Sequence, residues 1–152
     1  MAVLTQAEVD CLIAELDPHV GTEEDREAIG RIALAKYLTE IPQFGENYCP
    51  DGVTDNNVVL QSDVAINVAR KTIGHFVKLI NVASDSEKLA EFQMKYAKRK
   101  ARKLMAKELF VTGEPVVIEF YRSLFKNPEN QAAIERLMKH TFQVIRSNFE
   151  EN

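Results

Sequence analysis

The sequence predicts an all-α protein of six to eight helices, folded as a single domain over residues 1–152. Apolar residues recur roughly every three or four positions along most of the chain, which is the periodicity of amphipathic helices. Six glycines and five prolines are too few for a β protein with many tight turns. With 45% apolar and 28% charged residues, the composition is that of a globular chain. A disordered chain is therefore excluded.

Helix-start signals and prolines set the expected boundaries near the N-terminus. Thr5 followed by Glu8 forms a capping box, so a first helix should begin there. Pro18 disfavours helical geometry at the preceding residue, so this helix should stop at about Asp17. An acidic first turn after Thr22 suits the helix dipole and should open a second helix.

The same kind of signal divides the rest of the chain. A long central helix is expected from about residue 58 to residue 83. A capping box over residues 84–87 should open a helix rich in basic residues. Pro115 should kink or interrupt the helix that follows. Asn127 before Pro128 is a strong start signal for the last helix.

Basic residues are concentrated in one segment of a mildly acidic chain. The net charge is −4, yet no acidic residue occurs between Phe92 and Lys107. Seven of the 19 basic residues lie in this segment, which leaves 12 basic against 23 acidic residues elsewhere. They are Lys95, Lys98, Arg99, Lys100, Arg102, Lys103 and Lys107.

Two interpretations of this segment remain open. It is either a solvated face balanced by acidic surface elsewhere, or a site for an anionic small molecule or an acidic protein surface. Nucleic acid is disfavoured, because the whole chain is acidic and Tyr96 alone supplies an interleaved aromatic ring. The candidate anion-binding face, whose members can share one side of a helix, consists of Lys95, Arg99, Arg102 and Lys103.

Several classes of protein are not indicated by the sequence. No apolar run reaches the roughly 18 residues of a membrane-spanning helix, and the N-terminus does not resemble a signal peptide. Cys11 and Cys49 do not make a disulfide framework, which favours a reducing, cytoplasmic location. No phosphate-binding loop, metal-ligand spacing or nucleophile motif occurs, so we expect no enzyme. A homo-oligomer remains open.

The order and spacing of several segments resemble the globin family, the annelid and other invertebrate globins most of all. The segment from Lys36 to Pro42 resembles the second globin helix running into the short third one. Residues 68–72 resemble the distal stretch of the E helix, and residues 102–110 the passage from the F to the G helix. Residues 132–145 resemble the H helix. The resemblance implies an all-α globin fold with a haem pocket.

Departures from the globin pattern bear directly on haem. A globin holds haem iron through a histidine on its F helix, but the three histidines, His19, His75 and His140, all lie outside residues 86–103. Different gap placements put Ala97, Arg99 or Lys100 at the histidine's position. Tyr48 stands where a phenylalanine usually wedges the haem, and Val68 stands at the distal histidine position.

Lys100 and His75 are the candidate axial ligands if haem is bound. Only a neutral amine binds iron, and deprotonating a lysine of pKa about 10.4 at pH 7 costs roughly 4–5 kcal/mol. A histidine carries little of this cost. For His75, two interpretations are open. It is either a haem ligand or a half-buried helix residue that hydrogen-bonds to an ordinary partner. The candidate pocket residues are Tyr48, Val68, Lys71, Thr72, His75, Leu79, Phe92, Tyr96 and Phe110.

Two functions follow from this pattern. The favoured one is an atypical globin-like protein, haem-free or unusually ligated, that acts as a ligand-binding or protein-interaction module. No cofactor is favoured, and haem is the alternative. The alternative is a haem-binding globin that reversibly binds oxygen or another diatomic gas through an unusual axial ligand. The missing histidine supports the first function, and the family resemblance supports the second.

Overall fold

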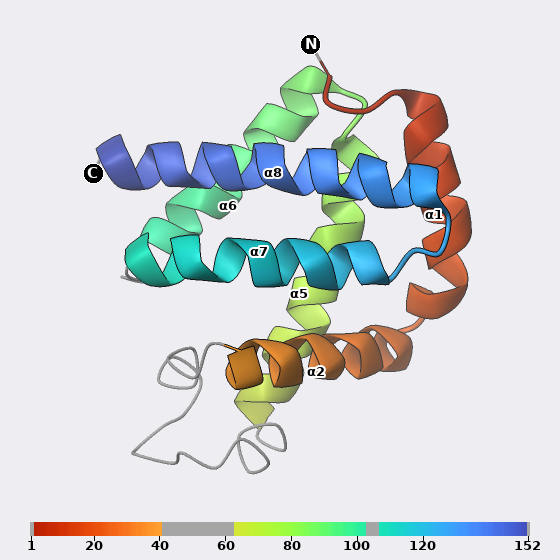
Figure 1. The fold of residues 1–152 in the computed structure, drawn as a ribbon, viewed down its shortest axis with the longest axis horizontal. Coiled ribbons are helices and arrows are strands. Elements are labelled where there is room, and N and C mark those ends of the chain that lie inside the picture. The colour runs from red at the N-terminus through yellow and green to blue at the C-terminus, as the bar shows by residue number, and fades with distance from the viewer. Residues whose placement is uncertain (1, 41–62, 103–106, 152) are drawn as a thin grey trace. The chain divides into compact units, whose positions relative to one another are not determined.

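The computed structural model describes residues 2–40, 63–102 and 107–151, which form six helices and no strand (Figure 1). The prediction of an all-α fold is confirmed. Tyr48, Cys49 and Lys103 lie outside the described residues. The helices are α1 (Gln6–Val20), α2 (Glu23–Glu40), α5 (Asp63–Val82), α6 (Ser86–Arg102), α7 (Lys107–Ser123) and α8 (Pro128–Glu151).

Three predicted helix starts are confirmed by hydrogen bonds from a backbone N–H to a side-chain oxygen. Such a bond satisfies a donor that the first turn leaves without a helical partner. Thr5 Oγ1 accepts from the Glu8 N–H at 3.1 Å, and Thr22 Oγ1 accepts from the Asp25 N–H at 3.1 Å. Asn127 Oδ1 accepts from the Glu129 N–H at 2.9 Å.

Prolines affect two helices less than the sequence suggested. The predicted end of α1 at Asp17 is wrong, because the helix continues through Pro18 to Val20. Val20 is buried, and its carbonyl oxygen accepts a hydrogen bond from Arg26 Nε at 2.9 Å, which satisfies one of the last carbonyls of the helix. Pro115 also lies inside α7, which the structure assigns as a continuous helix rather than an interrupted one.

The start of α6 was predicted in the right place but with the wrong cap. Asp85 caps the helix, since its Oδ1 accepts hydrogen bonds from the backbone N–H groups of Glu87 and Lys88, both at 3.1 Å. A carboxylate is a strong acceptor at a helix N-terminus. The Ser84 hydroxyl instead donates to Oε1 of Gln6 at 2.6 Å.

The chain divides into two compact units, which are described separately. Residues 17–76 form one unit, with α2 and the first part of α5. Here α2 approaches α5 closely at Gly30, where an added methyl group would lie 2.4 Å from the carbonyl oxygen of Ala69. Glycine is therefore the residue that fits this crossing. Buried residues on the two helices include Ala33, Leu34, Ala69, Ile73 and Phe76.

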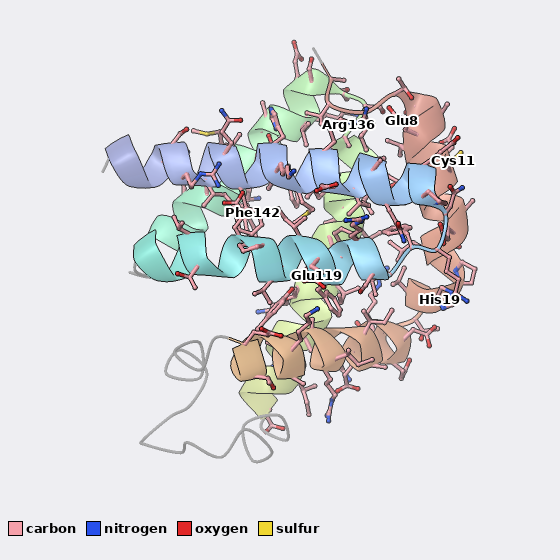
Figure 2. The ribbon with its side chains drawn as sticks, viewed as in Figure 1. Glu8, Cys11, His19, Glu119, Arg136 and Phe142 are labelled. Carbon is pink, nitrogen blue, oxygen red and sulfur yellow. The ribbon has the colours of Figure 1, made fainter. Side chains whose placement is uncertain are left out.

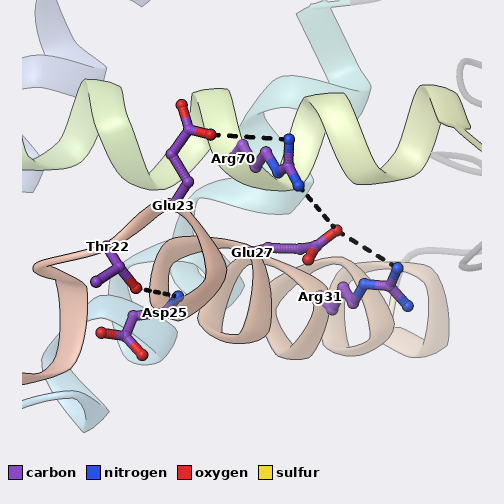
Figure 3. Close-up of polar contacts among 6 residues, drawn as sticks. All are labelled: Thr22, Glu23, Asp25, Glu27, Arg31 and Arg70. Atoms are coloured by element: carbon purple, nitrogen blue, oxygen red, sulfur yellow. Dashed lines mark hydrogen bonds and ion pairs between the residues drawn. The ribbon is translucent and has the colours of Figure 1, made fainter.

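Charged side chains connect the same two helices on their outer side. Arg70 of α5 lies 4.0 Å from Glu23 and 3.9 Å from Glu27 of α2 (Figure 3). Arg31 lies 3.6 Å from Glu27, one turn along α2. Arg70, Glu23 and Arg31 are substantially exposed, so these pairs add little stability individually.

Residues 1–16 and 77–152 form the other unit, in which α8 packs against α6 and α7 (Figure 1). The apolar stripe of α8 is buried, as its helical periodicity indicates. It includes Ile134, Leu137, Met138, Phe142 and Ile145.

Polar contacts tie α1 to α8 within this unit. Glu8 of α1 forms an ion pair with Arg136 of α8 (Figure 2). Two turns further along α1, Glu15 accepts hydrogen bonds from the Lys126 N–H at 2.6 Å and from Asn130 Nδ2 at 2.8 Å. Desolvation acts to raise the pKa of Glu15, but these hydrogen bonds outweigh it and hold that pKa below its ordinary value.

Two glycines in helices should respond oppositely to alanine. Gly30→Ala should lower the free energy of unfolding by about 1–3 kcal/mol, because the backbone of Ala69 has to move. Gly74→Ala, the matched control on α5, meets nothing within 4 Å and should raise it by about 1 kcal/mol through helix propensity. Urea denaturation measures both changes. A Gly30→Ala protein as stable as the wild type would contradict the close approach.

Candidate functional site

Helix α6 has a buried face and an exposed face. Leu89, Gln93 and Ala97 are buried and follow one another at four-residue spacing, and α6 packs against α8. Lys95 and Lys98 are exposed. Because successive residues turn by about 100° around a helix, this register gives the angular position of every other residue of α6.

Gln93 is a buried polar residue at the contact of α6 with α8. Its side chain is 1% exposed, and Nε2 lies 2.9 Å from Oγ1 of Thr141 and 3.0 Å from Nδ1 of His140. Thr141 Oγ1 donates to the carbonyl oxygen of Leu137 at 2.9 Å, so it accepts from Gln93. With Nε2 of Gln93 as the donor to both residues, Nδ1 of His140 is an acceptor in this arrangement.

The sequence analysis missed Gln93. The signal for it was its place between Leu89 and Ala97, four residues from each on a helix that needs one apolar stripe. A polar side chain at such a position requires a partner on the facing helix. Here Thr141 and His140 supply the partners.

The three histidines lie on three helices other than α6. His19 is exposed in the last turn of α1, and His75 is half-buried on α5. His140 on α8 is exposed and uses Nδ1 in the contact with Gln93. The helix that resembles the haem-ligating one thus carries no imidazole.

The register of α6 separates the three residues considered for the proximal position. Ala97 belongs to the buried line that faces α8. Position 99 lies only about 40° from the exposed Lys95 around the helix axis. Position 100 lies about 20° from both Leu89 and Gln93. Among the three, position 100 is therefore the one that combines the register of Leu89 and Gln93 with a residue type that has a nitrogen donor.

The predicted pocket residues divide between the two compact units. Residues 17–76 hold Val68, the exposed Lys71, and the half-buried Thr72 and His75, all on α5. The other unit holds buried Leu79 at the end of α5, half-buried Phe92 and Tyr96 on α6, and Phe110 on α7. Phe92 and Tyr96 lie one turn apart on one side of α6. A pocket formed by these residues remains a prediction.

The candidate anion-binding face is placed in part. Lys95 is exposed on α6, and positions 99 and 102 follow within the same helix. Among the described residues, the ion pairs of 4.0 Å or less do not include Lys88, Lys95 or Lys98. These lysines therefore present their charge to the surroundings.

Two further findings apply to the part of the chain that the structure describes. No group of three or more histidine, cysteine, aspartate or glutamate side chains there could hold a metal ion. None of its helices is long and apolar enough to cross a membrane.

Comparisons with known proteins bear out the resemblance. No family model matches the chain. A globin of Isoparorchis hypselobagri is 32% identical over 143 residues, which is 92% of this chain and 95% of that protein. The chain belongs to the globin family. A globin of Dicrocoelium dendriticum is 23% identical over 95% of this chain and 94% of its own length.

A solved structure agrees with the globin fold. A globin-like protein of C. elegans superposes with a TM-score of 0.72 at 16% identity, over 96% of this globin and 94% of that chain. At this identity the likeness concerns the fold alone. The prediction of an all-α globin fold is confirmed, whereas the function of the site depends on its residues.

The contact of Gln93 with Thr141 can be measured as a coupling energy. Gln93→Ala and Thr141→Val should each destabilise this globin, and the double variant should lose about 0.5–3 kcal/mol less than the sum of the two. Combining Gln93→Ala with Gln143→Ala, an exposed control on α8, should be additive. Unfolding in urea measures all the variants. Additivity for Gln93 with Thr141 would show that the amide does not bond to the hydroxyl.

Proposed function

We propose that this globin works without haem, as a ligand-binding or protein-interaction module. The observation that carries the proposal is the absence of histidine from α6, together with a lysine at position 100, in helical register with the buried Leu89 and Gln93. The fold family implies a haem group, so the donor chemistry of the helix decides whether that group fits.

The donors of α6 do not fit a haem iron. A neutral imidazole is the usual ligand, and the nitrogen donors in the last two turns of α6 are lysine and arginine side chains. An arginine stays protonated at any physiological pH, and a lysine must first give up its proton. Binding of haem would therefore begin with an energetic cost that a histidine avoids.

Membership of the globin family supports a second candidate function. In that alternative, Lys100 or His75 ligates haem and the protein reversibly binds oxygen or another diatomic gas. His75 is half-buried on α5. We favour the haem-free function because it requires no lysine to lose its proton at a pH well below its ordinary pKa.

We also expect this globin to lack catalytic activity and to reside in the cytoplasm. Cys11 is an exposed free thiol on α1, which is compatible with a reducing compartment. No catalytic signature accompanies the fold in the sequence.

Titration with haemin tests the proposed function. The wild-type protein should bind haemin loosely and without one-to-one stoichiometry, as followed by the Soret absorbance. Lys100→His, which supplies an imidazole at the position in register with Leu89 and Gln93, should bind haemin more tightly than the wild type. The matched control, Lys98→His, places the same imidazole on the exposed face and should behave like the wild type.

Two results would favour the alternative function instead. Tight one-to-one binding by the wild type that disappears in Lys100→Ala would establish lysine ligation. Tight binding that disappears in His75→Ala would establish ligation from α5. Circular dichroism of each variant distinguishes loss of a ligand from loss of the fold.

A further inference from the structure

We propose that the exposed side of α6 docks a narrow acidic segment of a partner protein. The inference rests on the proposed function and names the partner that an interaction module of this kind would bind. The docking line is defined by four helix positions, those of Lys88, Lys95, Arg99 and Arg102.

Helix geometry places these four positions along one side of α6. At about 100° per residue they fall within a sector of about 60°. The rise of about 1.5 Å per residue makes the line about 21 Å long. Lys88 and Lys95 are exposed, and the buried line of Leu89, Gln93 and Ala97 lies on the other side of the helix.

The charge of the docking line is not balanced on its own helix. Glu91, which is exposed, lies at the edge of the line, and no acidic residue follows it until Glu108. Neither Lys88 nor Lys95 belongs to an ion pair among the described residues. Like charges one or two turns apart repel one another, and an anionic partner would relieve this repulsion.

The shape of the line and the charge of the chain favour a narrow acidic segment. An extended peptide of about six residues, at about 3.3 Å per residue, covers 21 Å. Outside the basic segment the chain carries 23 acidic and 12 basic residues, so a broad anionic surface would meet repulsion. The Debye length of about 8 Å confines attraction to groups that touch the line itself.

A membrane surface fits the same helix less well. A helix that lies in a lipid interface buries a continuous apolar face, often with Trp, Phe or Leu. The large apolar residue exposed on α6 is Met94, at 37%, whereas Phe92 and Tyr96 are half-buried. The apolar face of α6 is already used against α8.

Fluorescence anisotropy with a labelled glutamate-rich peptide tests the docking line. The peptide is long enough to cover the line, and binding is measured at low and at physiological salt. Wild-type protein should bind in a salt-sensitive manner. Lys95→Gln, Arg99→Gln and Arg102→Gln together should weaken binding about tenfold, as expected for the loss of three charge contacts of a few tenths of a kcal/mol each.

A triple variant with the same change in charge is the control. Lys78, Arg122 and Lys126 are exposed residues outside α6, and their replacement by Gln should leave binding unchanged. The proposal would be overturned if both triple variants lost affinity equally, or if neither variant lost affinity. The proposal would also be overturned if the peptide did not bind, while phosphatidylserine vesicles or single-stranded DNA bound in a salt-sensitive manner and lost this binding in the α6 triple variant.

Absorbance of the same samples keeps this test separate from the proposed function. A colourless protein that does not bind the peptide would overturn the docking line but would not contradict the haem-free function. A protein with a Soret band that binds the peptide through α6 would overturn the haem-free function and support the docking line. Thermal unfolding of each variant confirms that the fold is retained.

Discussion

The packing of α6 against α8 is the constraint on which the account of this globin depends. Gln93 can be buried only because Thr141 and His140 of α8 meet its amide nitrogen, at 2.9 Å and 3.0 Å. This contact fixes the rotation of α6 about its own axis. Once the rotation is fixed, helical geometry gives every position of α6 a register relative to this contact, including position 100 and the positions of the basic residues.

Membership of the globin family favours a haem-binding function, whereas the residues of α6 favour a haem-free one. A 32% identical globin establishes the family, but a fold does not carry its function without the residues of the site. In α6 the position in register with Leu89 and Gln93 is a lysine, and basic residues recur at positions 88, 95, 99 and 102. Both features belong to the same few turns, which is why we place the function of the protein on this helix.

Much of the fold could be predicted from local sequence signals, because capping is a short-range interaction. Thr5, Thr22 and Asn127 cap their helices as their neighbours in the sequence indicated. Pro18 was misjudged, because the contacts that allow α1 to reach Val20 come from Arg26 and from burial, which a proline rule does not contain. The cap of α6 was misjudged because two adjacent residues, Ser84 and Asp85, were both good caps.

The candidate site was less predictable than the fold. Periodicity identified the apolar side of α6, but Gln93 could not be recognised as buried without knowing what faces it on α8. The close approach of Gly30 to Ala69 likewise joins residues far apart in the sequence. Such features depend on tertiary contacts, and a single sequence does not contain them.

The absorption spectrum of the freshly purified protein tests the central claim most directly. We expect helical circular dichroism with no Soret band and no iron, since α6 offers no imidazole to hold haem. A Soret band with one haem for each chain, in protein that was never exposed to added haemin, would contradict it.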